Sequence, residues 1–294
     1  MRSNKVQITP VLGQSNNAHQ INIQRKNGAN VMQKKAPVSK KAYDNHEFIH
    51  GHSARHIRVL SEFIQPEECF RKNDIHNTIV FFGSARAMPK KQARRRVLNP
   101  GEKRDKCILT SQAYEDCIEL ARRITEWSNK IKNPKDRFYL CSGGGPGIME
   151  AANKGAHLAK GKSIGLNISL PFEQESNPYI TPELNLEFHY FFIRKFWFLY
   201  YAKALVAFPG GFGTFDEVFE ILTLLQTKKL KKHMPVVLYG KAFWNSIFNF
   251  DALLEYGVIA KQDLALFKIF DDVDSAYDYI ITELKHMPPN LLYS

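Results

Sequence analysis

The chain has 294 residues, enough to bury the core of one large α/β domain or of two smaller domains. Hydrophobic residues make up 44% of it, but Arg194, Lys195 and Lys203 interrupt its longest apolar stretch, so no run reaches the roughly 20 residues of a membrane helix. The N-terminus lacks the apolar core of a signal peptide, and we therefore expect a cytoplasmic protein with no membrane partner.

The formal net charge of +12 is concentrated in two segments. Residues 1–58 carry ten Lys and Arg against two acidic residues, and residues 89–106 carry eight against two. The rest of the chain is close to neutral, and no aromatic stacking pattern accompanies the basic segments. Solvated segments therefore explain the charge better than a nucleic-acid surface does.

The cysteines give no sign of a metal site or of a disulfide framework. None has CxxC spacing or a partnered histidine; they are Cys69, Cys107, Cys117 and Cys141. We expect free thiols in a reducing compartment and no bound metal.

In chain order, residues 1–56 come first and are rich in Asn, Gln, Lys and Ser. We predict that they form a disordered basic tail, and that residues 57–290 form a single domain. The first part of that domain, residues 57–70, has the apolar spacing of a short helical region that Pro66 interrupts.

From residue 77 onward, short apolar runs alternate with segments of helical spacing. The predicted strands are 77–84, 137–145, 163–169, 204–208 and 235–240, and the predicted helices are 107–130, 147–160, 192–203, 214–230, 242–257 and 272–286. Residues 89–106 are predicted to be a basic loop insertion. This alternation predicts an α/β, Rossmann-like, doubly wound fold, with a mainly parallel sheet and helices on both faces. In such sheets ligands bind at the carboxyl ends of the strands.

Two glycine-rich turns follow predicted strands. The first is "SGGGPGIMEAAN" at residues 142–153, and the second is "PGGFGT" at residues 209–214, where Thr214 is predicted to cap the next helix. Glycine lets backbone N–H groups approach an anion, and the N-terminus of the following helix favours negative charge. Each turn alone is equally consistent with a tight strand-to-helix connection, but two in one sheet favour a phosphorylated ligand.

The common nucleotide fingerprints are absent. The sequence has no GxxxxGK[ST], which disfavours a P-loop NTPase, and no GxGxxG with a later acidic residue, which disfavours a dinucleotide site.

Charged residues accompany both turns. Glu217 and Glu150 lie about one turn into the two following helices, where the helix dipole alone would also favour acids. Arg194 and Lys195 lie in an aromatic segment, and a buried cation requires a partner, either an anionic ligand or a carboxylate such as that of Glu217.

Together, "GGGPGIMEAAN", the "RK" pair at 194–195 and "PGGFGTFDE" resemble the motifs of the Lonely Guy (LOG) family, most closely its longer bacterial branch. The resemblance covers about residues 57–290. Members of this family are phosphoribohydrolases that activate cytokinins and were formerly labelled possible lysine decarboxylases. No lysine here has the setting of a pyridoxal phosphate Schiff base, so we reject that label.

The resemblance implies hydrolysis of the N-glycosidic bond of a nucleoside 5′-monophosphate, such as AMP or a cytokinin riboside 5′-monophosphate, to free base and ribose 5-phosphate. It implies a homodimer or a higher homo-oligomer and requires no cofactor. The alternative is a non-catalytic carrier that binds a nucleotide or a nucleotide-like cofactor in the same loops.

The family's catalytic residues fall on Arg194 and Glu217. A carboxylate beside the anomeric carbon would stabilise the positive charge that grows on the sugar as the bond breaks. The residues expected to bind substrate are Ser84, Arg86, Gly143, Gly144, Gly145, Gly147, Glu150, Glu173, Lys195, Pro209, Gly210, Gly211, Gly213, Thr214 and Thr223. Phe198 departs from the family pattern, which often has Met there.

Overall fold

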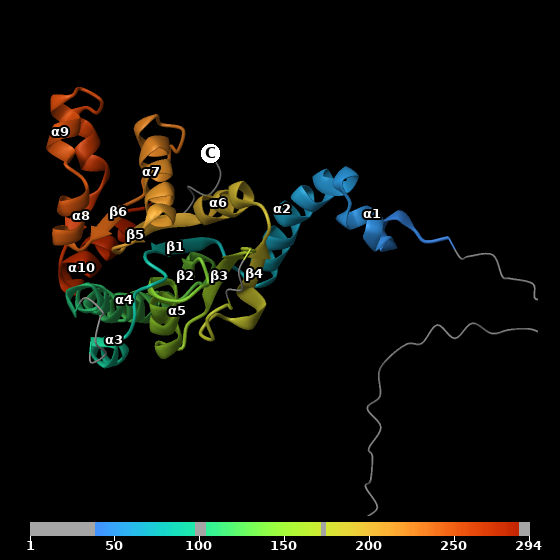
Figure 1. Cartoon of the computed structure of the whole chain (residues 1–294), viewed down its shortest axis with the longest axis horizontal. Coiled ribbons are helices and arrows are strands. Elements are labelled where there is room, and N and C mark those ends of the chain that lie inside the picture. The colour runs from blue at the N-terminus through green and yellow to red at the C-terminus, as the bar shows by residue number, and fades with distance from the viewer. Residues whose placement is uncertain (1–38, 98–103, 172–174, 288–294) are drawn as a thin grey trace, which may run out of the picture.

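The computed structural model describes residues 39–97, 104–171 and 175–287, and within them seven strands form one parallel sheet (Figure 1). The strand order is β4-β3-β2-β1-β5-β6-β7, and every neighbouring pair is parallel. The strands are β1 (Asn77–Phe82), β2 (Phe138–Ser142), β3 (Ser163–Ile168), β4 (Asn185–Phe188), β5 (Ala202–Ala207), β6 (Val236–Tyr239) and β7 (Lys268–Phe270). The predicted α/β fold with a parallel sheet is confirmed.

Helices cover both faces of this sheet. The α-helices are α1 (His46–His50), α2 (Arg55–Lys72), α3 (Lys90–Val97), α4 (Arg104–Asn129), α5 (Ile148–Leu158), α6 (Phe191–Tyr200), α7 (Phe212–Gln226), α8 (Lys241–Ile247), α9 (Phe250–Glu255) and α10 (Val273–Lys285). Short 3₁₀ helices are η1 (Ala42–Asp44), η2 (His52–Ala54), η3 (Pro134–Asp136), η4 (Pro182–Leu184) and η5 (Lys261–Leu266). In Figure 1, α3, α4 and α5 lie on one side of the sheet, and α6, α7 and α8 lie on the other.

The two faces form two hydrophobic cores because successive strand residues point to opposite sides. In β1, Ile79 and Phe81 pack in the core shared with α4, α5 and α10. Val80 and Phe82 pack in the core shared with α2, α6, α7 and α8. A strand buried on both faces has no polar alternation, which is why these strands are short continuous apolar runs in the sequence.

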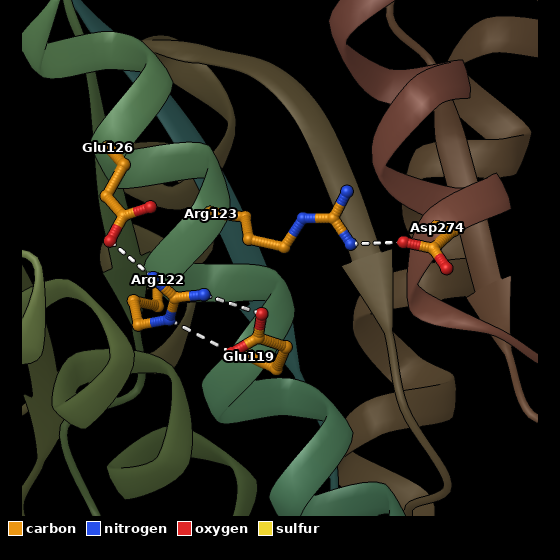
Figure 2. A network of polar contacts seen from close by, with 5 residues as sticks. All are labelled: Glu119, Arg122, Arg123, Glu126 and Asp274. Atoms are coloured by element: carbon orange, nitrogen blue, oxygen red, sulfur yellow. Dashed lines mark hydrogen bonds and ion pairs between the residues drawn. The ribbon is translucent and has the colours of Figure 1, made fainter.

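A polar network on α4 reaches the start of α10 (Figure 2). Arg123 of α4 forms an ion pair with Asp274 of α10 at 2.5 Å, and Arg122 pairs with Glu119 and Glu126 of its own helix. Because these side chains are partly exposed, the network contributes at most about 1 kcal/mol per pair, and α4 is held mainly by apolar packing.

The chain order creates a topological switch beside β1. After β1 the chain passes through β2, β3 and β4 to one edge of the sheet, then returns to add β5 on the other side of β1. The connections that leave β1 and β5 therefore diverge, and a crevice at their carboxyl ends is expected.

Pro66 does not interrupt the first long helix, contrary to the sequence prediction. Helix α2 continues through Pro66, which lacks the N–H that would donate to the carbonyl of Glu62. The indole Nε1–H of Trp197 donates to that carbonyl at 3.0 Å, so the oxygen has a partner from α6. This contact is between distant parts of the chain and has no local sequence signal.

Other predicted boundaries differ in detail. The predicted helix 242–257 is two helices, because the chain turns after α8 and the side chain of Asn249 accepts from the Ala252 N–H to begin α9. The short strands β4 and β7 were not among the predicted strands. Helix α3 and the start of α4 lie within the stretch 89–106 that was predicted to be a loop.

The predicted tail, residues 1–56, is described by the structure only in part. Residues 1–38 lie outside the described residues, whereas η1, α1 and η2 are helical within the segment predicted to be disordered. Arg58 of α2 fixes them by donating to the carbonyls of Ile49 and Gly51. Within the described ranges, no helix has the length and apolar character needed to span a membrane.

Candidate active site

A cavity of about 1170 Å³ opens at the carboxyl ends of β1, β2, β5 and β6, where the topological switch predicts a crevice. Its wall combines the turn after β1, the turn after β5, and residues of α4, α6 and α7. The predicted site residues that line it are Ser84, Arg86, Gly143, Arg194, Pro209, Gly210, Gly211, Gly213, Thr214 and Glu217.

Ser84 links the turns that surround the cavity. Its N–H donates to the carbonyl of Pro209 and its carbonyl accepts from the N–H of Ile148, both at 3.0 Å. Gly147 must be glycine here, because its φ is +72° and a Cβ would lie 2.2 Å from the Ser84 carbonyl oxygen. The three strand-end turns therefore form one hydrogen-bonded unit.

Hydrogen bonds with two polar side chains hold the first glycine-rich turn in place. The Gly144 N–H donates to Ser142 Oγ at 3.1 Å, and the Asn177 amide donates to the carbonyls of Gly144 and Gly145. Gly143 lines the cavity, whereas Gly144, Gly145 and Gly147 lie outside its lining. Asn177, which sequence reasoning missed, is the residue that fixes this turn.

The second glycine-rich turn opens α7 at the cavity. The N-cap is Gly211, so Thr214 is not the cap that the sequence predicted but a buried residue of the first turn. Its side chain packs on Gly210, where a Cβ would lie 2.1 Å from Thr214 Oγ1. The first-turn amides have no acceptor within the helix, and no side chain caps them.

Glu217 is a buried carboxyl group on the second turn of α7, only 4% exposed. Burial raises its pKa to about 7; the positive charges of Arg194 and Lys195 oppose this rise, and Glu220 and Asp216 add to it. A carboxyl group with a pKa near neutrality gains or loses a proton in the range where a general base works best.

Arg194 is on α6 and lines the same cavity as Glu217. Its guanidinium lies between the rings of Phe191 and Phe198, at 5.2 Å and 5.4 Å from their centroids. Burial lowers its pKa, and the charge of Glu217 opposes that effect. Its Nε is buried without a hydrogen-bond partner, and no described acid lies at ion-pair distance from it. Because Arg194 also lines the cavity, a ligand bound there would lie beside this guanidinium.

Lys195 and Thr223 lie on a second, shallower hollow of about 520 Å³ along α7. Lys195 Nζ forms ion pairs with Asp216 at 2.8 Å and with Glu220 at 2.9 Å. The hydroxyl of Thr223 donates to the carbonyl of Phe219 in its own helix. Neither residue lines the main cavity in the described structure.

Two further predicted residues are Glu150, which does not line the cavity, and Glu173. Glu150 of α5 accepts a hydrogen bond from the hydroxyl of Tyr114 at 2.6 Å. Glu173 lies outside the described residues. Both stay predictions.

Helix α4 and strand β6 contribute a polar part of the cavity that sequence reasoning missed. Asp116 accepts hydrogen bonds from Gln112 Nε2 at 2.6 Å and from the Tyr239 hydroxyl at 3.0 Å, and all three residues line the cavity. Burial and the charge of Asp116 raise the pKa of Tyr239, so its hydroxyl remains a donor. No local pattern joins residues 123 positions apart in the sequence. Within the described ranges, no group of three or more His, Cys, Asp or Glu residues is placed to hold a metal ion.

Comparison with known proteins finds one matching family model and several similar solved structures. Residues 149–280 match the family model described as "Possible lysine decarboxylase", the older label of the family that the motifs resemble. This segment runs from α5 into α10 and carries both Arg194 and Glu217. No curated protein matches the sequence.

Two of the similar solved structures are described as cofactor-binding proteins. A molybdenum cofactor binding protein from Rippkaea orientalis is 17% identical with a TM-score of 0.44, over 70% of this chain and 96% of that chain. A molybdenum cofactor carrier protein from Chlamydomonas reinhardtii is 20% identical with a TM-score of 0.43, over 71% of this chain and 98% of that chain.

Proposed function

We propose that this protein hydrolyses the N-glycosidic bond of a nucleoside 5′-monophosphate and releases free base and ribose 5-phosphate. One observation carries the proposal: a buried carboxyl group of near-neutral pKa, Glu217, lies in the same cavity as the glycine-rich start of α7 and the unpaired guanidinium of Arg194. These are the parts that cleavage of a ribosyl–base bond requires.

The start of α7 is the proposed site of the 5′-phosphate. The uncapped amides of Phe212, Gly213 and Thr214 point out of the helix, and the helix dipole adds partial positive charge. Arg86 on the neighbouring turn supplies a full positive charge to the same cavity. A phosphate held there positions the sugar without taking part in the reaction.

Glu217 lies about one turn farther along α7 and lines the same cavity, and we propose that the sugar of the nucleotide extends toward it. In the reaction, the C1′–N bond breaks, positive charge develops on the sugar, and a water oxygen bonds to C1′. The ionised Glu217 stabilises that charge and takes the proton from the water. The departing base leaves with the electron pair of the broken bond and takes a proton from solvent, while Glu217 returns the proton of the water to solvent, so that the net reaction consumes one water.

Arg194 is proposed to act on the departing base or on Glu217. Its side chain lines the cavity and carries a positive charge, which suits donation from the guanidinium to a base that accumulates negative charge. Its positive charge also favours the ionised form of Glu217. The rest of this wall is apolar, with Phe191, Phe198 and Met149, as expected for a face that stacks a base.

A panel of AMP, GMP, CMP, UMP and a cytokinin riboside 5′-monophosphate tests the proposal by chromatographic detection of free base. We expect release from at least one substrate, and a loss of at least about 10²-fold in Glu217→Gln. Glu255→Gln, a change at an exposed residue of α9, is the matched control and keeps full activity. Release that persists in Glu217→Gln refutes the proposed mechanism.

A non-catalytic carrier of a nucleotide-like cofactor is the second candidate. The observation that favours it is the cavity volume of about 1170 Å³, larger than the ~300–1,000 Å³ of most small-ligand sites. Tight binding of nucleotides with no base release from any of them would establish this alternative. Such a carrier would need the turn that opens α7 but not Glu217, so Glu217→Gln would then leave binding intact.

A further inference from the structure

Lys195 connects two acidic residues that flank Glu217 along α7. Its ammonium lies 2.8 Å from an oxygen of Asp216 and 2.9 Å from an oxygen of Glu220. Asp216 directly precedes Glu217, and Glu220 follows it by three positions, which places it on a neighbouring part of the helix surface. The pairing therefore joins α6 to α7 at the level of the proposed catalytic carboxyl group.

Four charged groups on α6 and α7 act on the charge of Glu217. Arg194 and Lys195 come from α6 and favour the ionised carboxylate, while Asp216 and Glu220 come from α7 and disfavour it. Without Lys195, its positive charge would no longer balance the negative charges of Asp216 and Glu220. Those charges would then disfavour the ionised form of Glu217 more strongly.

We propose that Lys195 is a positioning residue for Glu217 and not a ligand of the substrate. Its charge, held in place by Asp216 and Glu220, neutralises part of the acidic surroundings and keeps Glu217 in the carboxylate form that the proposed reaction uses. The inference rests on the proposed function for that last step alone, since the electrostatic relationship exists whether or not the protein is an enzyme.

The surroundings of Lys195 support this assignment over a direct contact with substrate. The side chain lies on the shallow hollow beside α7, separate from the cavity that holds Arg194 and Glu217. Burial opposes its charge, yet hydrogen bonds to Asp216 and Glu220 raise the pKa of Lys195 above its ordinary value. Two of the three N–H donors of Lys195 are engaged by carboxylates, whose negative charges also disfavour a phosphate beside it.

The test is the titration of Glu217 itself, followed by carbon NMR of protein labelled at the glutamate side-chain carboxyl. The Glu217 signal is identified by its absence in Glu217→Gln. Three variants are compared with the wild type: Lys195→Met removes the charge, Lys195→Gln removes it but keeps a hydrogen-bonding group beside both acids, and Lys195→Arg keeps the charge.

We expect the Glu217 midpoint to move upward by about one pH unit in both neutral variants and to stay near the wild-type value in Lys195→Arg. Lys195→Gln decides the question if Lys195→Met does not fold. An unchanged Glu217 midpoint in a folded neutral variant overturns the proposal. This readout needs no substrate, so it stands even if the protein releases no base.

If base release is found, its pH dependence gives a second readout. A positioning role predicts that kcat/KM of Lys195→Gln falls about tenfold at pH values below the wild-type midpoint and approaches the wild-type value at high pH. A substrate ligand predicts instead an equal loss at every pH together with a raised KM. The second pattern overturns the proposal.

Discussion

Trp197 donates its indole N–H to the carbonyl of Glu62, the oxygen that Pro66 leaves without a helical donor. The carboxylate of the same Glu62 accepts from the N–H groups of His189 and Tyr190 just before α6. Two helices distant in sequence therefore complete each other's backbone hydrogen bonds. Since α6 carries both Arg194 and Lys195, this contact fixes the helix that supplies the cationic side of the site.

Trp197→Phe is expected to lower the free energy of unfolding by about 1–3 kcal/mol, because the Glu62 carbonyl then remains unpaired in a packed interface. Urea unfolding measures the change. Restoring a backbone donor with Pro66→Ala in the same chain should recover part of the loss. Phe192→Leu, at an exposed position of α6, is the control and should change stability by no more than about 0.5 kcal/mol.

The glycines of the two turns should respond differently to a methyl group. Gly147→Ala places a Cβ 2.2 Å from the Ser84 carbonyl at a φ of +72°, so we expect a loss of about 3 kcal/mol or more. At Gly213, by contrast, nothing lies within 4 Å of a Cβ and the residue is helical.

Gly213→Ala should therefore leave the fold intact or stabilise it by up to about 1 kcal/mol. If the start of α7 binds phosphate, the added methyl group weakens nucleotide binding even so. Thermal unfolding and nucleotide titration by calorimetry measure the two effects separately. Destabilisation without a change in affinity would argue against a phosphate at this turn.

The position of the cavity could be predicted from the sequence because the signals that mark it are local. Glycine turns at strand ends mark the carboxyl edge of a parallel sheet, and "PGGFGT" and Glu217 lie on one turn and the helix that it opens. What it could not predict depends on contacts between distant elements. Examples are the Tyr239–Asp116 bond and the engagement of Lys195 by Asp216 and Glu220. Three residues are also too few to give β7 a recognisable pattern.

Glu217 should make the protein less stable as the pH rises. Its pKa is about 7 in the folded state against an ordinary value of 4.5, so folding favours its protonated form. That stabilisation is complete below pH 4.5 and is lost as the pH rises through 7, a cost of about 3 kcal/mol.

Glu217→Gln removes this titration. Above pH 7 the variant should therefore exceed the wild type in free energy of unfolding by up to about 3 kcal/mol, and the difference should shrink toward pH 4.5. Urea unfolding across this range provides the measurement. A constant difference at every pH would show that Glu217 does not titrate as its burial requires.

Arg194→Met tests whether the cation of α6 serves function at the expense of stability. The guanidinium is desolvated, its Nε is unpaired, and an unbranched apolar side chain would keep the packing between Phe191 and Phe198. We expect the melting temperature to stay equal or rise, because an imperfectly compensated charge has been removed.

Base release by the same variant should fall by about 10²–10³-fold, as when one preorganised donor is removed from a reacting centre. Its rising pH limb should also move to higher pH, because Arg194 no longer favours the carboxylate of Glu217. Arg194→Lys keeps the charge but lacks the planar group that lies between the two rings, so it should restore the pH limb and only part of the rate. If Arg194→Met lowers stability and leaves the pH limb in place, then Arg194 is a packing residue and the cationic half of the proposed site is wrong.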